Sequence, residues 1–181
     1  MRPRSYRTEG IILHRINVGE ADRILTVMTR NHGKIRCIAK GVRRPTSTKA
    51  ASVELFTRSR LFLVKGRSLD LLTQSEVLER FSQIRTDLGL SKACYHLAEL
   101  VDALTAEGVA NESIYTALLE QIRHMSRERR VTRGQIRRFE ENLLTDLGFG
   151  LPKQEGRGAL KVFIEGIIER RLRTEEMLKE T

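Results

Sequence analysis

The sequence predicts an α+β protein in which a small β-barrel is followed by an all-α helical domain. In the first half, short segments of alternating polar and apolar residues are separated by glycine turns, whereas apolar residues in the second half recur at helical spacing. The charge divides in the same way. Residues 1–80 hold 17 Lys and Arg against 7 Asp and Glu, and residues 81–181 hold 16 of each kind. We therefore expect two parts with different functions, of which the basic one meets a polyanion.

The first part contains five segments with the composition of short β-strands, at residues 6–15, 23–29, 34–40, 53–65 and 69–73. Turn signals such as Asn31-His32-Gly33 separate them. Five short strands leave unpaired edges unless the sheet closes on itself. We therefore predict a five-stranded barrel of the OB (oligonucleotide/oligosaccharide-binding) type over residues 1–80.

The second part, residues 81–181, shows the 3.6-residue period of amphipathic helices. Helices are expected at residues 91–104, after Asn111, between Thr132 and Gly148, and at residues 159–172, with a short fifth helix from Thr174. Asn111 is placed as an N-cap, and Thr132 with Gln135 forms a capping box. Gly148 is placed to end the third helix. The prediction is a helical bundle.

Residues 30–49 carry seven Lys and Arg side chains and no acidic residue. On a strand, Lys34, Arg36 and Lys40 point to one side at intervals of about 7 Å, with Ile38 as the apolar exception on that side. This interval is close to the phosphate spacing of an extended single strand, so we favour phosphate contacts over a merely solvated surface. The residues expected to contact nucleic acid are Lys34, Arg36, Lys40, Arg43, Arg44, Lys49, Arg58 and Arg60.

The segment around Arg58 and Arg60 has two possible roles. If the fourth strand is unbroken, Phe56 and Phe62 share the face of these arginines and offer a stacking platform for bases. The opposite face, which includes Leu61, is equally able to face a core, and alternation does not decide between the two. Because the chain has no Trp and only three Tyr, we expect the affinity to be mainly electrostatic and weakly sequence-selective.

Other function classes have little support. No apolar run is long enough to span a membrane and no signal peptide is recognisable, so we expect a cytoplasmic protein without a membrane partner. Cys37 and Cys94 fit no metal-binding spacing and are expected to be buried thiols. Glu20 and Asp22 suit turn capping or pairing with an arginine better than metal binding. With no catalytic triad or nucleotide loop, we expect no cofactor, no metal and no enzymatic activity.

Short motifs occur in a fixed order along nearly the whole chain. They include residues 9–14 (EGIILH), 19–26 (GEADRILT), 39–43 (AKGVR), 66–69 (GRSL), 95–100 (YHLAEL), 137–140 (RRFE) and 147–149 (LGF). In these residues the chain resembles the RecO family of bacterial recombination mediators. No single motif is diagnostic, but the ordered set is specific. The resemblance implies an N-terminal OB domain and a C-terminal helical domain, in agreement with the pattern-based prediction.

The resemblance also implies functions that composition and spacing do not. Members of the family bind single- and double-stranded DNA, anneal complementary strands and load recombinase onto DNA coated by single-stranded-DNA-binding protein. A RecR-type partner and a bacterial, nucleoid-associated location follow from the same resemblance. The helical domain would receive the acidic, apolar C-terminal tail of the coating protein, with Arg137, Leu144 and Phe149 as candidates. A surface ion pair between Arg137 and Glu141 is an equally supported role for this arginine.

One departure from the family stands out. Many members carry a zinc-binding or zinc-like Cys module after the Leu-Gly-Phe/Tyr turn, whereas residues 151–158 contain no Cys and lead almost directly into the last helix. We therefore predict a short form that lacks the zinc module. Two rival functions stay open: an OB-type RNA-binding module of translation or ribosome assembly, and a scaffold whose basic barrel binds an acidic protein.

Overall fold

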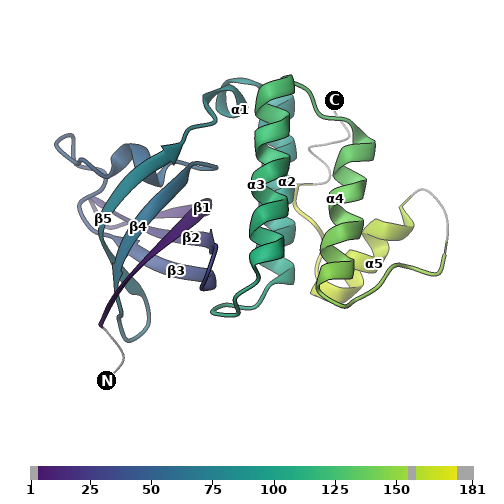
Figure 1. The fold of residues 1–181 in the computed structure, drawn as a ribbon, viewed down its shortest axis with the longest axis horizontal. Helices are drawn as coiled ribbons and strands as arrows, with labels where there is room; N and C mark the ends of the chain where they lie inside the picture. The colour runs from purple at the N-terminus through teal and green to yellow at the C-terminus, as the bar shows by residue number, and fades with distance from the viewer. Residues whose placement is uncertain (1–3, 155–157, 175–181) are drawn as a thin grey trace. The chain divides into compact units, whose positions relative to one another are not determined.

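The computed structural model of the chain describes residues 4–154 and 158–174 (Figure 1). Its residue contacts divide into two compact units. The first unit consists of Met1–Phe81 with Ala106–Tyr115, and the second consists of Ser82–Thr105 with Thr116–Thr181. The first unit holds every strand of the described residues. A division of function between residues 80 and 81 stays a prediction.

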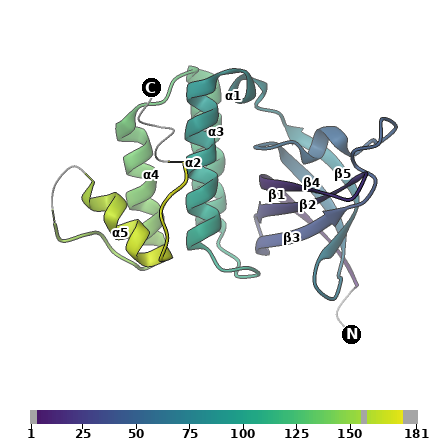
Figure 2. The same ribbon diagram turned by 180° about the vertical axis from the view of Figure 1, so that it is seen from behind.

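Five strands form a closed barrel in the first unit. They are β1 (Ser5–Val18), β2 (Asp22–Thr29), β3 (Gly33–Ala39), β4 (Arg58–Val64) and β5 (Asp70–Glu79). Neighbours follow the order β1-β2-β3-β5-β4, and β4 pairs again with β1 to close the sheet. All pairs are antiparallel except β3 with β5. The strand order confirms the predicted OB-type barrel, which Figures 1 and 2 show from two sides.

The core of the barrel follows the predicted alternation. On β3, Ile35, Cys37 and Ala39 are buried, whereas Arg36 is exposed. Aliphatic side chains from the other strands complete the cluster, among them Ile12, Leu25, Val27, Leu61, Leu63 and Leu72. Burial of one side chain of this size stabilises the folded state by about 1.5–3 kcal/mol. The core therefore gives the residues on the outer face of the barrel a stable backbone.

The fourth strand begins at Arg58, later than predicted, because a short 3-10 turn, η1 (Ala50–Val53), precedes it. Within this turn the Ser52 hydroxyl donates to the Lys49 carbonyl over 2.8 Å. The Ser59 hydroxyl in turn donates to the Ser52 carbonyl over 2.7 Å. Such local bonds offer the backbone an alternative to strand pairing. The loop after β3 is therefore longer than the alternating pattern indicated.

The possible aromatic face on the fourth strand does not form. Phe56 lies before β4, has a left-handed backbone (φ 61°) and is 2 % exposed. Phe62 is half-buried within β4. Because Phe56 belongs to the interior, the two rings do not make a shared platform for bases.

The helices are α1 (Ser82–Thr86), α2 (Leu88–Leu104), α3 (Glu112–Glu128), α4 (Arg133–Asp146) and α5 (Ala159–Ile168). The predicted caps are confirmed: the Asn111 side chain accepts the Ile114 N–H over 3.1 Å, and Thr132 with Gln135 forms a capping box. Gly148 follows α4 with φ 80°. Sequence analysis missed α1, whose only buried residue is Ile84, because a single apolar residue carries no period.

The last helix ends at Ile168, earlier than predicted, and Glu169 takes a left-handed conformation (φ 54°). A buried carboxylate, Glu99 on α2, holds the segment that follows. It accepts hydrogen bonds from Arg170 Nη1 (2.6 Å), Thr174 Oγ1 (2.7 Å) and the backbone N–H groups of Arg173 and Thr174. These bonds replace further helical turns. Beyond Thr174, the predicted fifth helix lies outside the described residues.

The segment Ala106–Tyr115 packs with the barrel through backbone contacts. The Gly108 N–H donates to the Lys34 carbonyl over 2.8 Å, and a side-chain ion pair joins Arg30 to Glu112 over 2.7 Å. Gly33, with φ 64°, lies so close to Val109 that a β-carbon would stand 2.0 Å from its carbonyl oxygen. This segment therefore covers the first residues of β3, which have no β5 partner.

Candidate nucleic-acid interface

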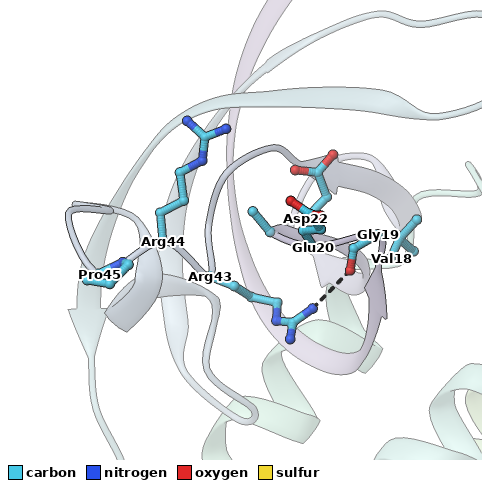
Figure 3. A pocket seen from close by; sticks show the side chains of 8 residues that line it. Val18, Gly19, Glu20, Asp22, Arg43, Arg44 and Pro45 are labelled. Carbon is cyan, nitrogen blue, oxygen red and sulfur yellow. Dashed lines mark hydrogen bonds between the residues drawn. The ribbon is translucent and has the colours of Figure 1, made fainter.

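Two loops are bonded to each other at one end of the barrel (Figure 3). The first is the turn between β1 and β2, and the second is the segment of residues 40–45 that follows β3. Asp22 Oδ1 accepts the Gly41 N–H over 2.7 Å, and the Ala21 carbonyl accepts the Arg43 N–H over 2.9 Å. Asp22 thus binds the backbone of the second loop rather than that of its own turn.

Side chains of the second loop point to different sides. Arg43 reaches back to the turn, where its Nη1 donates to the Gly19 carbonyl over 3.2 Å, whereas Arg44 points away from it (Figure 3). Gly41 has φ 65°, a conformation that other residues adopt only with strain, and it turns the chain sharply after β3. The two loops line an open cleft of about 520 Å³.

Four exposed cations follow the outer face of β3 into this loop. They are Arg36, Lys40, Arg43 and Arg44, which we call the β3 cation group. Within residues 4–154 and 158–174, none of the four forms an ion pair with a carboxylate. No internal carboxylate thus competes there with the phosphates of a polyanion.

Two nearby arginines of the barrel, unlike the β3 cation group, are paired with a carboxylate. Arg15 and Arg23 both pair with Glu54, over 2.5 and 3.2 Å. Burial alone raises the pKa of Glu54, but its hydrogen bonds and its attraction to the two arginines lower the pKa below the usual value. The carboxylate therefore stays charged and holds both arginines near neutral pH.

Two lysines predicted for the interface are placed differently from the β3 cation group. Lys34 is half-buried at the start of β3, where its carbonyl accepts the Gly108 N–H. Lys49 is half-buried as well, and its Nζ donates to the Leu72 carbonyl over 3.3 Å. Lys34 shares the outer face of β3 with Arg36 but is less exposed, whereas the Lys49 side chain is bound to the backbone of β5.

Arg58 and Arg60, also predicted to contact phosphates, lie in an ion-pair network on β4. Arg58 pairs with Glu9 over 2.7 Å and with Glu79, and its Nε donates to the Tyr115 hydroxyl over 3.2 Å. Burial alone lowers the pKa of Arg58, but the hydrogen bonds to Glu9, Glu79 and Tyr115 outweigh it and raise the pKa. Arg60 pairs with Glu76 over 2.7 Å and with Glu9 over 3.7 Å. A phosphate would have to displace these carboxylates.

The three residues expected to receive a partner tail differ in their exposure and in their partners. Arg137 pairs with Glu141 over 2.8 Å at the surface, which was the alternative role for this arginine. Leu144 has no exposed surface, whereas Phe149 is 43 % exposed. The Phe149 N–H donates to the Leu144 carbonyl over 3.0 Å, in the bonding pattern of a Schellman cap. Leu144 thus belongs to the end of α4 and to the core.

No group of three or more His, Cys, Asp or Glu side chains in the described part of the chain is arranged to hold a metal ion. Cys37 and Cys94 are buried, and burial raises the pKa of both thiols, to about 12 for Cys37. Thiols with such pKa values are poor nucleophiles and poor metal ligands at neutral pH. Among the same residues, no helix has both the length and the apolar character that a membrane span requires.

Comparison with known proteins gives matches to two family models. "Recombination protein O N terminal" matches residues 1–81, and "Recombination protein O C terminal" matches residues 85–173. A DNA repair protein RecO from Roseiflexus sp. (strain RS-1) is 42 % identical over 149 residues, which are 82 % of this chain and 52 % of the relative. One from Desulforudis audaxviator is 39 % identical over 147 residues, 81 % of this chain and 58 % of the relative. The chain spans about half the length of the curated relatives it matches.

Proposed function

Because the chain belongs to the RecO family, we propose that it acts in DNA repair and recombination by binding single-stranded DNA through the β3 cation group. The observation that carries the proposal is the exposure of Arg36, Lys40, Arg43 and Arg44 without a carboxylate partner in the described part of the chain. Phosphates that replace bound counterions there gain affinity from the released ions. Hydrogen bonds between the two loops hold Lys40 and Arg43 in place before DNA arrives.

The proposed activity needs no catalytic group. A cationic surface that holds two complementary strands screens their mutual repulsion and raises their local concentration, and base pairing then drives annealing. Duplex DNA binds to the same cations through its phosphates alone. Loading of recombinase onto coated DNA is the part of the proposal that needs other proteins.

The second unit is proposed to contact those proteins, a RecR-type partner and the C-terminal tail of the single-stranded-DNA-binding protein. It provides exposed Phe149 and the Arg137–Glu141 pair as the local features that an acidic, apolar tail recognises. Leu144 supports Phe149 through the helix cap. The tail carboxylates would have to compete with Glu141 for the arginine.

Charge reversal of the loop tests the DNA-binding proposal. We expect Lys40→Glu with Arg43→Glu to weaken binding to a single-stranded oligonucleotide by more than about tenfold and to reduce the slope of log K against log salt. Fluorescence anisotropy over a series of salt concentrations measures both quantities. Annealing of complementary labelled oligonucleotides, which depends on the same surface, is expected to slow in parallel.

A matched control changes the net charge equally at another place. Arg130→Glu with Arg133→Glu alters two exposed arginines of the second unit, and we expect DNA affinity and salt slope to change less than about twofold. Equal losses in both double variants would mean that net charge alone matters. Unchanged binding by the loop variant would refute the assigned surface, and stronger competition by structured RNA than by single-stranded DNA would favour an RNA-binding module.

A further inference from the structure

Three isoleucines form a row across the outer face of β1, β2 and β3. Ile16 lies opposite Ile24, and Ile24 lies opposite Ile38. Ile16 is 59 % exposed, and the other two are partly exposed. The barrel core takes the alternate positions, such as Leu25 and Cys37, so these isoleucines are not core residues. A solvated sheet face normally carries polar residues at such positions, so an apolar row in register is unusual.

Cations lie on both sides of Ile38, the β3 member of this row. Arg36 precedes Ile38 by two residues and Lys40 follows it by two, which places each about 7 Å from the isoleucine along the same face. Beyond Lys40, the backbone turns at Gly41 toward Arg43 and Arg44. Asp22, two residues before Ile24, and Glu20 in the preceding turn are acids near this row, and the Oδ1 of Asp22 accepts the Gly41 N–H. The row is therefore an apolar strip with cations at its β3 end.

We propose that Ile16, Ile24 and Ile38 are a base-contacting strip that sets the preference of this surface for single-stranded over double-stranded DNA. The inference rests on the proposed function and adds a second kind of contact to it. Unpaired bases have apolar faces that gain by leaving water, and an aliphatic strip can cover them. In a duplex these faces are stacked on one another, so only the phosphates are available to the β3 cation group.

The cations at the β3 end of the strip select this occupant over an apolar protein surface. A strand of DNA presents a line of phosphates on one side of its bases, and that arrangement matches an apolar strip with cations at one end. The three isoleucines supply the contact that aromatic side chains provide in many single-strand-binding proteins, whereas in this barrel Phe56 is buried. An acidic, apolar peptide is the alternative occupant, and the test distinguishes it.

The test replaces isoleucine by threonine, which is also β-branched and keeps the strand propensity. We expect Ile16→Thr with Ile24→Thr to weaken binding of a single-stranded oligonucleotide about tenfold and binding of a duplex less than about twofold. The slope of log K against log salt is expected to stay unchanged, because the number of phosphate contacts is unchanged. Both ligands are measured by anisotropy at matched salt concentrations.

Two further variants distinguish loss of a base contact from loss of the fold. Ile16→Thr alone changes a side chain that is 59 % exposed, so its fold is expected to survive and its single-strand affinity to fall about threefold. Val162→Thr on α5 changes an apolar side chain of the second unit that is 69 % exposed, and the variant is expected to bind both ligands normally. Thermal unfolding of each variant verifies that the barrel is intact.

The outcomes separate this inference from the proposed function. If the isoleucine variants keep their single-strand preference while the Lys40/Arg43 charge reversal loses DNA, the strip is refuted and the cation group stands. If the charge reversal also binds normally, the proposed function itself fails. If the isoleucine variants lose affinity for an acidic, apolar peptide but not for single-stranded DNA, the strip is a peptide site and the inference is overturned.

Discussion

Asp22 and Gly41 are 19 residues apart in the sequence and are joined by a 2.7 Å hydrogen bond from the Gly41 N–H to the Asp22 carboxylate. The acceptor is the first residue of β2, and the donor lies in the loop that carries Lys40, Arg43 and Arg44. An acidic residue within a basic surface opposes DNA by its charge. Here its hydrogen bond also fixes the backbone of the loop proposed to bind DNA, so we expect its charge to weaken binding and its hydrogen bond to strengthen it.

Replacement of Asp22 separates these two effects. Asp22→Ala removes both the charge and the acceptor, and we expect single-strand affinity to fall about threefold because the loop loses its anchor. Asp22→Asn keeps an acceptor oxygen and removes the charge, so affinity is expected to stay equal or to rise. Anisotropy titrations measure both. Tighter binding by Asp22→Ala than by the unaltered protein would mean that the hydrogen bond has no positioning role.

Arg58 is expected to matter for stability rather than for DNA. Arg58→Ala leaves Glu9 and Glu79 without their shared cation in a half-buried site, and we expect a loss of about 2 kcal/mol in the free energy of unfolding. Single-strand affinity of the folded variant is expected to change less than about twofold. Urea unfolding and DNA titration are made on the same preparation. A large loss of DNA affinity in a variant that remains stable would show that Arg58 contacts DNA.

Glu99 is expected to make stability depend on acid pH. Burial alone raises its pKa, but the hydrogen bonds from Arg170, Thr174 and the backbone of residues 173 and 174 outweigh it and lower the pKa from 4.5 to about 2. Because the folded pKa lies below the unfolded one, the contribution is complete above pH 4.5 and is lost as the pH falls toward 2.

The matching variant is Glu99→Gln, which keeps the shape and removes the charge. We expect it to lower the free energy of unfolding by about 2 kcal/mol at pH 7 and by much less near pH 2.5. Urea unfolding at both pH values gives the comparison. A difference between variant and unaltered protein that is the same at both pH values would show that the carboxylate charge does not hold the segment 170–174.

Gly33 is expected to tolerate no side chain. Its φ of 64° disfavours other residues, and a β-carbon would lie 2.0 Å from the Val109 carbonyl oxygen. We expect Gly33→Ala to destabilise the barrel unit by about 3 kcal/mol or more and to release the segment 106–115 from β3. Amide hydrogen exchange of Gly108, whose N–H binds the Lys34 carbonyl, reports that release.

Gly148 provides the control for Gly33. It also has a positive φ (80°), but a β-carbon there meets nothing within 4 Å. Gly148→Ala is therefore expected to cost only about 1–2 kcal/mol, the strain of a left-handed residue at the end of α4. Equal losses at the two glycines would mean that the contact with Val109 does not restrict residue 33.

Local patterns were enough for much of the fold. The inward set Ile35, Cys37 and Ala39 follows from alternation alone, because successive side chains of a strand point to opposite faces. The caps at Asn111 and Thr132 follow from hydrogen bonds that span only three residues. Strand four was misjudged at its start because the bonds of Ser52 favour a turn over an apparently continuous strand.

The sequence alone therefore determined the closed barrel, the main helices and the concentration of basic residues in the first half of the chain. The tertiary structure decided which cations are available, because a carboxylate distant in sequence can neutralise an arginine that looks identical in a pattern. Glu79 and Glu9 occupy Arg58, whereas Lys40 and Arg43 have no such partner in the described ranges. It also aligned Ile16, Ile24 and Ile38, since strand register is set by pairing between segments that the order of residues does not bring together.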